Sequence, residues 1–304
     1  MNYKKTKIVI AIIVFLVLAL AAFAGLLYYQ NAENKAAEIA QQKALEQQAK
    51  EAAMAAEKER QAAEKQAYEL ADHVYSHRGA SSDEIEHTFA AYDKAIAQGS
   101  HNIEQDLVIS ADGTLYISHD LTSDRIAGSG GAFSSMTDSQ IDALTTSDGQ
   151  KILKLSDVFE KYGKSVKYII ELKSSDTRTV DAFRDVVDKY DMKDQVVVQC
   201  LELQALKDLE EYYPDMPKLY IVKDQSSFDY GLTKEYVDII GARKNLMSSS
   251  NCDKAHDSGK EFNAWTLDTD DEIISAIKMG ADSYFTNHTD RAIELEKEYR
   301  DNEE

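Results

Sequence analysis

Short apolar segments alternate with amphipathic helical patterns through residues 71–304, and no other feature constrains the fold as strongly. The apolar segments have the length and the β-branched content of strands. They are predicted at Val74–His77, Asn102–Ser110, Leu115–His119, Tyr168–Leu172, Gln195–Gln199, Lys218–Val222, Tyr236–Ile240, Glu261–Trp265 and Ser283–Thr286. Helices are predicted at Glu86–Gln98, Leu155–Tyr162, Thr177–Tyr190, Leu201–Tyr213, Asn251–Ser258, Thr269–Met279 and Arg291–Tyr299.

Strands that alternate with helices form parallel sheets, and residues 71–304 come close to the roughly 250 residues of one eight-fold barrel. We therefore predict an α/β protein with a (β/α)8 TIM-type barrel over 71–304. Two features interrupt the alternation. Ala111–Thr114 carries an Asp-Gly pair that joins two strands directly as a hairpin. Residues 121–154 are rich in Gly, Ser, Thr and Asp, and we predict a small insertion there.

The segment Ile8–Tyr29 contains no charged residue and is long enough, at about 1.5 Å per residue, to cross a hydrocarbon core of roughly 30 Å. Three lysines precede it, which indicates that residues 1–7 stay in the cytoplasm. We predict a single-pass transmembrane anchor at 8–29 that leaves the rest of the chain outside the cell. The alternative is a cleaved signal peptide, since Ala22–Ala24 is a small-x-small triplet. Both interpretations place the remaining chain outside the cytoplasm.

Residues 30–70 consist almost entirely of Ala, Glu, Gln and Lys, which are strong helix formers. No sustained heptad of large apolar residues marks a coiled coil, so we predict a solvated helical stalk that spaces the barrel from the membrane. The net charge of −20 argues against a nucleic-acid partner, because phosphate backbones are bound by Lys and Arg. Two cysteines, Cys200 and Cys252, exclude a disulfide scaffold, and their pairing is left open. Nothing in the sequence indicates a protein partner.

Polar side chains gather where predicted strands end, which is where a βα barrel carries its active site. These residues are His77, Arg78, Glu104, Asp106, His119, Glu171, Lys173 and Trp265. Three carboxylates in one pocket repel each other, and a divalent cation relieves that repulsion. Oxygen ligands suit a hard ion, so we predict one cation, Ca²⁺ or Mg²⁺. Two histidines beside a cation, an arginine and a lysine suit a phosphate ester, with one imidazole taking a proton and the other supplying one.

An ordered set of short motifs accompanies these residues. HRGA at His77–Ala80 is followed by IEQD at 103–106, DG at 112–113 and HD at 119–120. ELK at 171–173, WT at 265–266, GAD at 280–282 and FTNHTD at 285–290 continue the series. This order and spacing resemble the glycerophosphodiester phosphodiesterase family over almost all of residues 75–290. Residues 1–70 have no counterpart in the catalytic domain of that family.

The resemblance implies a βα barrel that hydrolyses glycerophosphodiesters to glycerol 3-phosphate and an alcohol. It implies metal ligands at Glu104, Asp106 and Glu171, and a general acid–base pair at His77 and His119. Arg78 and Lys173 are expected to contact the substrate phosphate, and Trp265 to line the substrate pocket. The residue that acts as the acid and the residue that acts as the base are left open.

The chain departs from the family pattern at two places. Where the family usually shows PENT, this chain has Ile85–Thr88, so Glu86 keeps the acidic position beside the metal or its ligands and His87 replaces an asparagine. Where the family usually shows WTVN, this chain ends the motif on Asp268. Four histidines without an assigned role, His87, His101, His256 and His288, are expected at the surface.

Two further functions remain compatible with the sequence. A barrel-type phospholipase would act on the membrane beside its anchor, but the insertion at 121–154 offers only a modest set of large apolar residues. A non-catalytic surface binding module would keep the barrel without the reaction, and the complete set of His and acidic residues argues against it. Soluble glycerophosphocholine-type diesters or teichoic-acid-type polymers are the expected substrates.

Overall fold

The computed structural model describes residues 3–300. Outside the described residues lie residues 1 and 2, which belong to the predicted cytoplasmic segment 1–7. The same holds for residues 301–304 at the end of the predicted catalytic domain. Contacts divide the chain into two units, Met1–Glu64 and Lys65–Glu304, and we describe each by itself.

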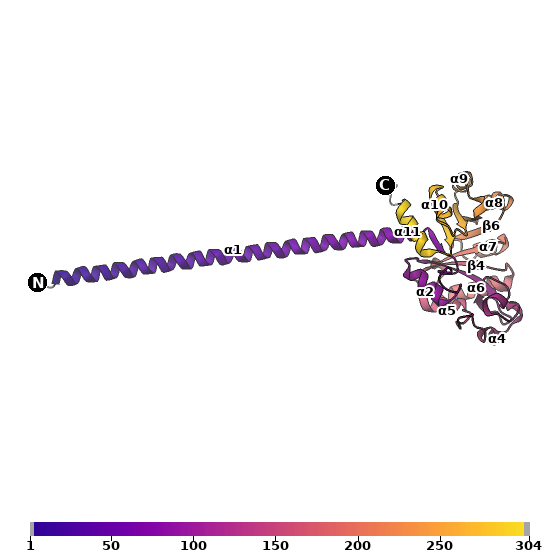
Figure 1. The fold of residues 1–304 in the computed structure, drawn as a ribbon, viewed down its shortest axis with the longest axis horizontal. Helices are drawn as coiled ribbons and strands as arrows, with labels where there is room; N and C mark the ends of the chain where they lie inside the picture. The colour runs from indigo at the N-terminus through magenta and orange to yellow at the C-terminus, as the bar shows by residue number, and fades with distance from the viewer. Residues whose placement is uncertain (1–2, 301–304) are drawn as a thin grey trace. The chain divides into compact units, whose positions relative to one another are not determined.

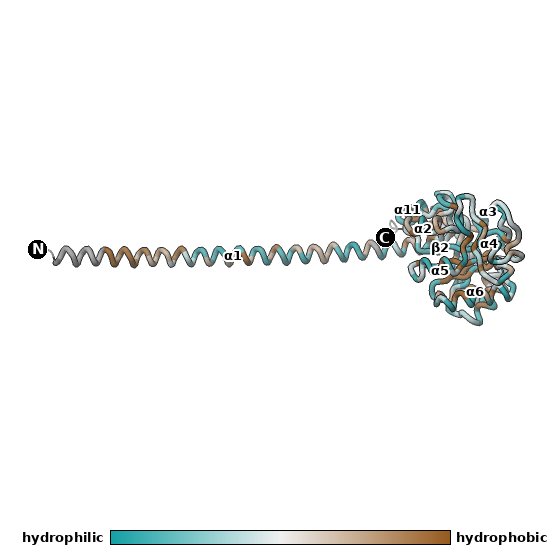
Figure 2. The backbone as a smooth tube through the Cα atoms, turned by 90° about the horizontal axis from the view of Figure 1, so that it is seen from below, coloured by the Kyte–Doolittle hydropathy of each residue, from teal (hydrophilic) through white to brown (hydrophobic). Residues whose placement is uncertain are grey.

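The first unit is made by one helix, α1, which runs from Tyr3 to Ala71 and ends in the second unit. Figure 2 shows its apolar stretch near the N-terminus, followed by mixed and hydrophilic stretches. The side chains described in this unit, from Ile13 onward, are exposed. By length and composition α1 is able to cross a membrane. The residues of the predicted stalk, 30–70, are helical throughout.

The second unit is a closed barrel of eight parallel strands with helices outside (Figure 1). Its strands are β1 (Val74–Ser76), β2 (Asn102–Ile109), β4 (Lys167–Leu172), β5 (Val196–Cys200), β6 (Lys218–Val222), β7 (Ile239–Arg243), β8 (Glu261–Trp265) and β9 (Ser283–Thr286). The barrel closes because β1 pairs in parallel with both β2 and β9. This confirms the predicted TIM-type barrel.

The strand β3 (Leu115–Ile117) is antiparallel to β2, so the Asp-Gly hairpin prediction is confirmed. The chain then leaves the barrel and forms the short helices α3 (Asp124–Ala127), η1 (Phe133–Ser135) and α4 (Asp138–Asp142). This excursion has a small core of its own, which comprises Val108, Tyr116, Phe133, Ile141 and Ile152. It coincides with the insertion predicted at 121–154.

The outer helices lie between the strands in chain order. They are α2 (Phe89–Ala97), α5 (Leu155–Tyr162), α6 (Thr177–Tyr190), α7 (Leu203–Glu210), α8 (Gln225–Leu232), α9 (Ser249–Asp257), α10 (Asp270–Lys278) and α11 (Thr289–Arg300), with 3₁₀ turns η2 (Lys193–Gln195) and η3 (Lys244–Leu246). In α6, the side chains of Val180, Phe183 and Val187 recur at helical spacing and are buried in the main core. The Asp176 side chain caps this helix by accepting a hydrogen bond from the backbone N–H of Thr179.

The strand alternation decides which side chains face the barrel interior. Along β4, Tyr168 and Ile170 belong to the core beneath the helices, whereas Ile169 belongs to a separate inner cluster. Leu219, Ile239 and Phe285 complete much of that inner cluster. Period-two geometry therefore turns Glu171, two residues after Ile169, toward the interior near the carboxyl end of β4.

Gly79 occupies the turn that leads from β1 toward α2. Its φ of +84° lies in the region that favours glycine, and an added Cβ would come within 2.7 Å of the carbonyl carbon of Ala91. We predict that Gly79→Ala lowers the free energy of unfolding by about 2–4 kcal/mol, because strain and overpacking add. Urea unfolding followed by the fluorescence of Trp265, the single tryptophan, measures the change in the barrel alone.

Gly259→Ala is the matched control. Gly259 has a φ of +72°, but an added Cβ would meet no heavy atom within 4 Å among the described residues. Backbone strain alone should cost about 1 kcal/mol there. Equal losses in the two variants would contradict the assigned crowding at Gly79.

Candidate active site

Strand register brings the acidic residues of two neighbouring strands, β2 and β4, together in the barrel. Asp106 of β2 pairs with Glu171 of β4, and Glu171 pairs with Gln199 of β5. Glu104 lies two residues before Asp106 and shares its face of β2. The three carboxylates predicted as metal ligands are therefore brought together by the parallel register, at the carboxyl ends of the strands.

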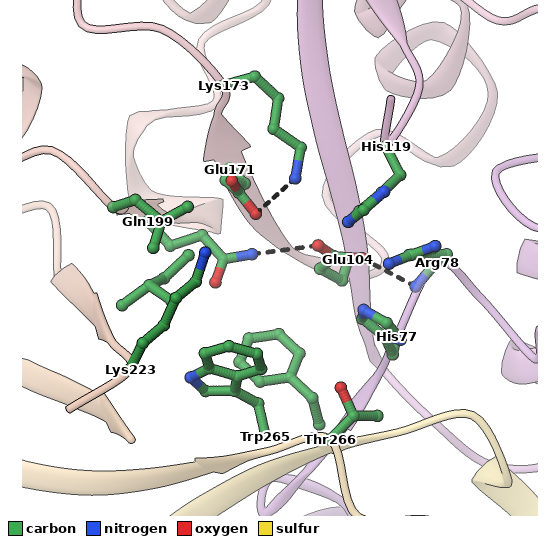
Figure 3. Close-up of a pocket in the computed structure, with 13 residues that line it drawn as sticks. His77, Arg78, Glu104, His119, Glu171, Lys173, Gln199, Lys223, Trp265 and Thr266 are labelled. Atoms are coloured by element: carbon green, nitrogen blue, oxygen red, sulfur yellow. Dashed lines mark hydrogen bonds and ion pairs between the residues drawn. The ribbon is translucent and has the colours of Figure 1, made fainter. Parts of the chain in front are cut away.

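A pocket of about 150 Å³ opens over these residues. Figure 3 shows His77, Arg78 and His119 on one side, Gln199 and Lys223 on the other, and Glu104 between them. Trp265 and Thr266 form part of the pocket wall at the end of β8. The indole N–H of Trp265 donates to the carbonyl oxygen of Gly241 at 2.7 Å, so the position of this ring is fixed from behind.

His77 follows β1 and is held by a neutral acceptor. Its Nδ1 lies 2.7 Å from Oδ1 of Asn287, which also accepts from the hydroxyl of Ser81. The Asn287 side-chain amide in turn donates to Asp268 at 3.1 Å. Burial and the Arg78 charge lower the pKa of His77 to about 4, so the ring is neutral near pH 7. With the proton on Nδ1, Nε2 keeps a free lone pair.

His119 lies on the loop after β3, on the same side of the pocket as His77, and is 40% exposed (Figure 3). Its Nδ1 lies 2.8 Å from the carboxylate of Asp120. The second oxygen of Asp120 accepts from Nε of Arg125 at 2.5 Å. The two predicted catalytic histidines thus line one pocket but have different partners, a neutral amide for His77 and a carboxylate for His119.

The three carboxyl groups of Glu104, Asp106 and Glu171 differ in pKa. Burial and the Asp106 charge raise the pKa of Glu104 well above its usual value, and the same causes raise the pKa of Glu171 to about 7. Burial alone would raise the pKa of Asp106, but the hydrogen bond from His87 and the charge of Lys173 hold it well below its usual range. The Lys173 ammonium lies 2.8 Å from Asp106 and 2.9 Å from Glu171.

His87 was predicted at the surface, and that prediction is wrong. The side chain is buried, with Nε2 2.9 Å from Oδ2 of Asp106 and Nδ1 3.0 Å from the hydroxyl of Tyr92. His101 is buried as well and contacts Asp72. The position of His87 in the loop after HRG, two residues before α2 begins, was the signal that places it beside the β2 acids.

Glu86 lies apart from the three carboxylates and binds two guanidinium groups. It accepts from Arg78 at 3.0 Å and from both terminal nitrogens of Arg125 at 3.0 and 2.7 Å. Burial opposes ionisation, but these partners lower the pKa of Glu86 to about 2. Arg78 also has its backbone N–H on Glu104 at 2.8 Å. Glu86 therefore holds the predicted phosphate-binding arginine in place.

The donor set fits a divalent cation. Burial and the Asp106 charge raise the pKa values of Glu104 and Glu171, and a bound cation would relieve this repulsion. Oε1 of Glu171 is buried without a hydrogen-bond partner among the described residues. His87, Glu104 and Asp106 offer ligand atoms that all lie within 4.8 Å of one another. Oxygen atoms with one imidazole nitrogen are ordinary ligands for divalent ions.

A candidate cation site, a pair of histidines and cationic side chains at the carboxyl ends of barrel strands suit the hydrolysis of phosphate esters. Residues 77–291 match the glycerophosphoryl diester phosphodiesterase family, and the chain belongs to that family. It is a phosphoric diester hydrolase. Outside the matched range lie α1 and the first barrel strand.

Characterised relatives cover the barrel. The glycerophosphodiester phosphodiesterase of Bacillus subtilis is 24% identical over 252 residues, covering 74% of this chain and 86% of that protein. That of Caldanaerobacter subterraneus subsp. tengcongensis is 26% identical and covers 73% and 96%. A phosphodiesterase of Oleispira antarctica, solved with the product sn-glycerol-3-phosphate, shares the fold with a TM-score of 0.69 at 19% identity, over 75% and 98% of the two chains. The enzyme from Thermotoga maritima aligns with a TM-score of 0.63 at 24% identity, over 73% and 97%.

Three residues of the site were not predicted from the sequence. Gln199 donates to Glu104 at 3.1 Å, and Lys223 lines the pocket opposite His77. Gln199 is the last residue of one predicted strand, and Lys223 directly follows another. A search for polar residues at strand ends could therefore have found both. Asn287 could not be found this way, because its contact with His77 joins residues 210 positions apart.

The lowered pKa of His77 predicts a pH dependence of stability. Below pH 6.5 His77 becomes protonated in the unfolded chain. In the folded protein His77 stays neutral until the pH falls to about 4. Stability is therefore lost as the pH falls through this window, by roughly 2–3 kcal/mol. We expect His77→Gln to flatten the profile of unfolding free energy, measured by urea unfolding of the metal-free protein between pH 7.5 and 4. Parallel profiles for the two proteins would show that His77 is not held neutral.

Proposed function

We propose that this chain hydrolyses glycerophosphodiesters to glycerol 3-phosphate and an alcohol at the outer cell surface, with one divalent cation. The observation that carries the proposal is the convergence of His77, His119, Glu104 and Glu171 on one pocket, with the buried Asp106 paired to Glu171 in the sheet. Family membership supplies the reaction class. Glu104, Asp106 and Glu171 are proposed to hold the cation, which when bound stabilises negative charge on the phosphate oxygens.

Arg78 and Lys173 are proposed to bind the non-bridging oxygens of the phosphodiester. The Arg78 guanidinium is oriented by Glu86 and lies at the pocket wall. Lys173 also lines the pocket, and its ammonium bridges Asp106 and Glu171. Charge-assisted hydrogen bonds from both groups are stronger than neutral ones and fix the phosphate relative to the histidines.

The partners of the two histidines support different roles. His77 is neutral, with Nδ1 engaged by Asn287, so Nε2 is available to remove a proton from the nucleophile. The nucleophile is water or the neighbouring glycerol hydroxyl. The Asp120 carboxylate lies 2.8 Å from Nδ1 of His119 and orients the ring, so His119 is proposed to protonate the leaving alcohol. We therefore assign His77 as base and His119 as acid.

The pocket supports a small polar substrate. Its volume of about 150 Å³ is comparable to a cavity that holds benzene, so it suits a head group and leaves no room for acyl chains. The wall is shared by Trp265 and the cationic Lys223, which suits a glycerol moiety and an anionic diester. Glycerophosphocholine-type diesters and teichoic-acid-type polymers meet this requirement, with the rest of a polymer outside the pocket. A barrel-type phospholipase is the second candidate and would need its acyl chains outside as well.

The catalytic test uses purified full-length protein in detergent with glycerophosphocholine. We expect His77→Asn and His119→Asn each to lower kcat by about 10²–10⁴-fold, because each removes a positioned proton-transfer group. Release of glycerol 3-phosphate measures turnover. Both variants should still bind the cation in calorimetric titrations, since neither histidine is a proposed ligand.

Chelation provides the control for metal dependence. EDTA should abolish turnover of the wild type, and added Ca²⁺, Mg²⁺ or a transition ion should restore it. Choline release that persists in EDTA would contradict the proposed cation. Hydrolysis of phosphatidylcholine vesicles in preference to glycerophosphocholine would favour the phospholipase, and absence of turnover on every diester would favour a binding module.

The outward location is proposed from α1. An uncharged segment at 8–29, preceded by three lysines, is the pattern of an anchor whose C-terminal side faces outward. We predict that protease added to intact cells cleaves within the stalk, 30–70, and releases an active barrel. Mass analysis of the retained fragment should show the segment 8–29. A mature N-terminus near residue 25 would instead show a cleaved signal, and a barrel protected in intact cells would reverse the orientation.

A further inference from the structure

We propose that His87 supplies an imidazole nitrogen to the cation, so that this site selects a transition-series ion such as Co²⁺ or Zn²⁺ over Ca²⁺ and Mg²⁺. The inference rests on the proposed function and concerns the same site. It replaces the oxygen-only ligand set expected from the sequence with a mixed set of nitrogen and oxygen atoms.

Ligand atoms of His87, Glu104 and Asp106 all lie within 4.8 Å of one another. The three side chains are 4%, 2% and 1% exposed. Nε2 of His87 lies 2.9 Å from Oδ2 of Asp106, close enough for both atoms to bind one ion after small shifts. Among the described residues, this is the group of His, Cys, Asp and Glu side chains that meets the geometry of a metal site.

The backbone around His87 aims the ring at the acids. His87 has a φ of +60°, which a residue with a side chain rarely adopts. Its N–H donates to the carbonyl oxygen of Arg78 at 3.0 Å, and Thr88, the next residue, caps α2. A strained residue held between the HRG turn and a helix start persists when the surrounding structure determines it, and such residues cluster at functional sites.

The second ring nitrogen already has the partner that a metal-binding histidine needs. Nδ1 lies 3.0 Å from the hydroxyl of the fully buried Tyr92. Without an ion, His87 donates from Nε2 to Asp106 and accepts the Tyr92 proton at Nδ1. With an ion on Nε2, the neutral ring carries its proton on Nδ1 and donates to the Tyr92 oxygen. A hydroxyl can donate or accept, so Nδ1 of His87 keeps a partner in both states.

The selectivity follows from ligand chemistry. Carboxylates suit Ca²⁺ and Mg²⁺, whereas imidazole suits Zn²⁺ and other later transition ions. Lys173, which lies between Asp106 and Glu171, also limits the oxygens available.

The competing interpretation is that His87 only donates a hydrogen bond to Asp106 and positions it. Both interpretations predict lower activity when His87 is changed, so activity does not separate them. Metal selectivity does, because loss of a positioning bond weakens every ion alike, while loss of a nitrogen ligand weakens transition ions selectively.

The experiment titrates metal-free, full-length protein in detergent with Co²⁺, Zn²⁺ and Ca²⁺, using calorimetry and, for Co²⁺, the visible absorption spectrum. We expect His87→Asn to lower Co²⁺ and Zn²⁺ affinity by on the order of 100-fold and to change Ca²⁺ affinity by less than about threefold. The Co²⁺ absorption bands should shift and weaken. Tyr92→Phe should lower Co²⁺ affinity by about tenfold through the lost partner on Nδ1.

His256→Asn is the matched control, since this exposed histidine lies on α9 and should leave all affinities unchanged. Urea unfolding monitored at Trp265 verifies that each variant folds. A parallel loss for Co²⁺ and Ca²⁺ in His87→Asn, or unchanged Co²⁺ bands, would overturn the nitrogen ligand. If the nitrogen ligand is overturned but the wild type hydrolyses glycerophosphocholine, the proposed function still holds. If the wild type keeps its Co²⁺ selectivity but hydrolyses no glycerophosphocholine, only the proposed function is overturned.

Discussion

Repulsion among the buried carboxylates of Glu104, Asp106 and Glu171 is the constraint on which the rest of the site depends. Burial makes their charges costly, and the structure meets this cost in two ways. Lys173 bridges two of the acids, and His87 donates to Asp106. Even so, Glu104 and Glu171 keep raised pKa values. This uncompensated repulsion is the basis for the proposal that the pocket binds a cation and, through it, a phosphate ester.

Arg78, one of the cationic side chains beside these acids, is held in place by a series of ion pairs. Arg78 reaches the pocket because Glu86 holds its guanidinium, and Glu86 is itself clamped by Arg125 from the insertion. The same Arg125 binds Asp120, the partner of His119. Arg125 of the insertion therefore helps to position both Arg78, the proposed phosphate ligand, and His119, the proposed acid. It does so through exposed polar contacts with Glu86 and Asp120.

Much of this could be predicted because local patterns decide it. The bounds of β6, β8, β9, α5 and α6 agree with the sequence, since each is a clear apolar run or a strong amphipathic pattern between turn residues. β7 was predicted three residues too early, because the apolar Tyr236 and Val237 pack as part of the approach to the strand. Helix α8 was missed, since Gln225–Leu232 carries few large apolar residues. Asn287 contacts His77 across 210 positions of the sequence, and no local pattern contains such a contact.

The closure of the barrel between its first and last strands has a consequence for how the enzyme is made. His77 follows β1, yet the amide that orients it, Asn287, follows β9, some 210 positions later. During synthesis His77 therefore precedes its partner by the whole length of the barrel. The ring gains the Asn287 contact only after β9 has been made, so a chain that stops before β9 carries the acids and Arg78 without an oriented His77.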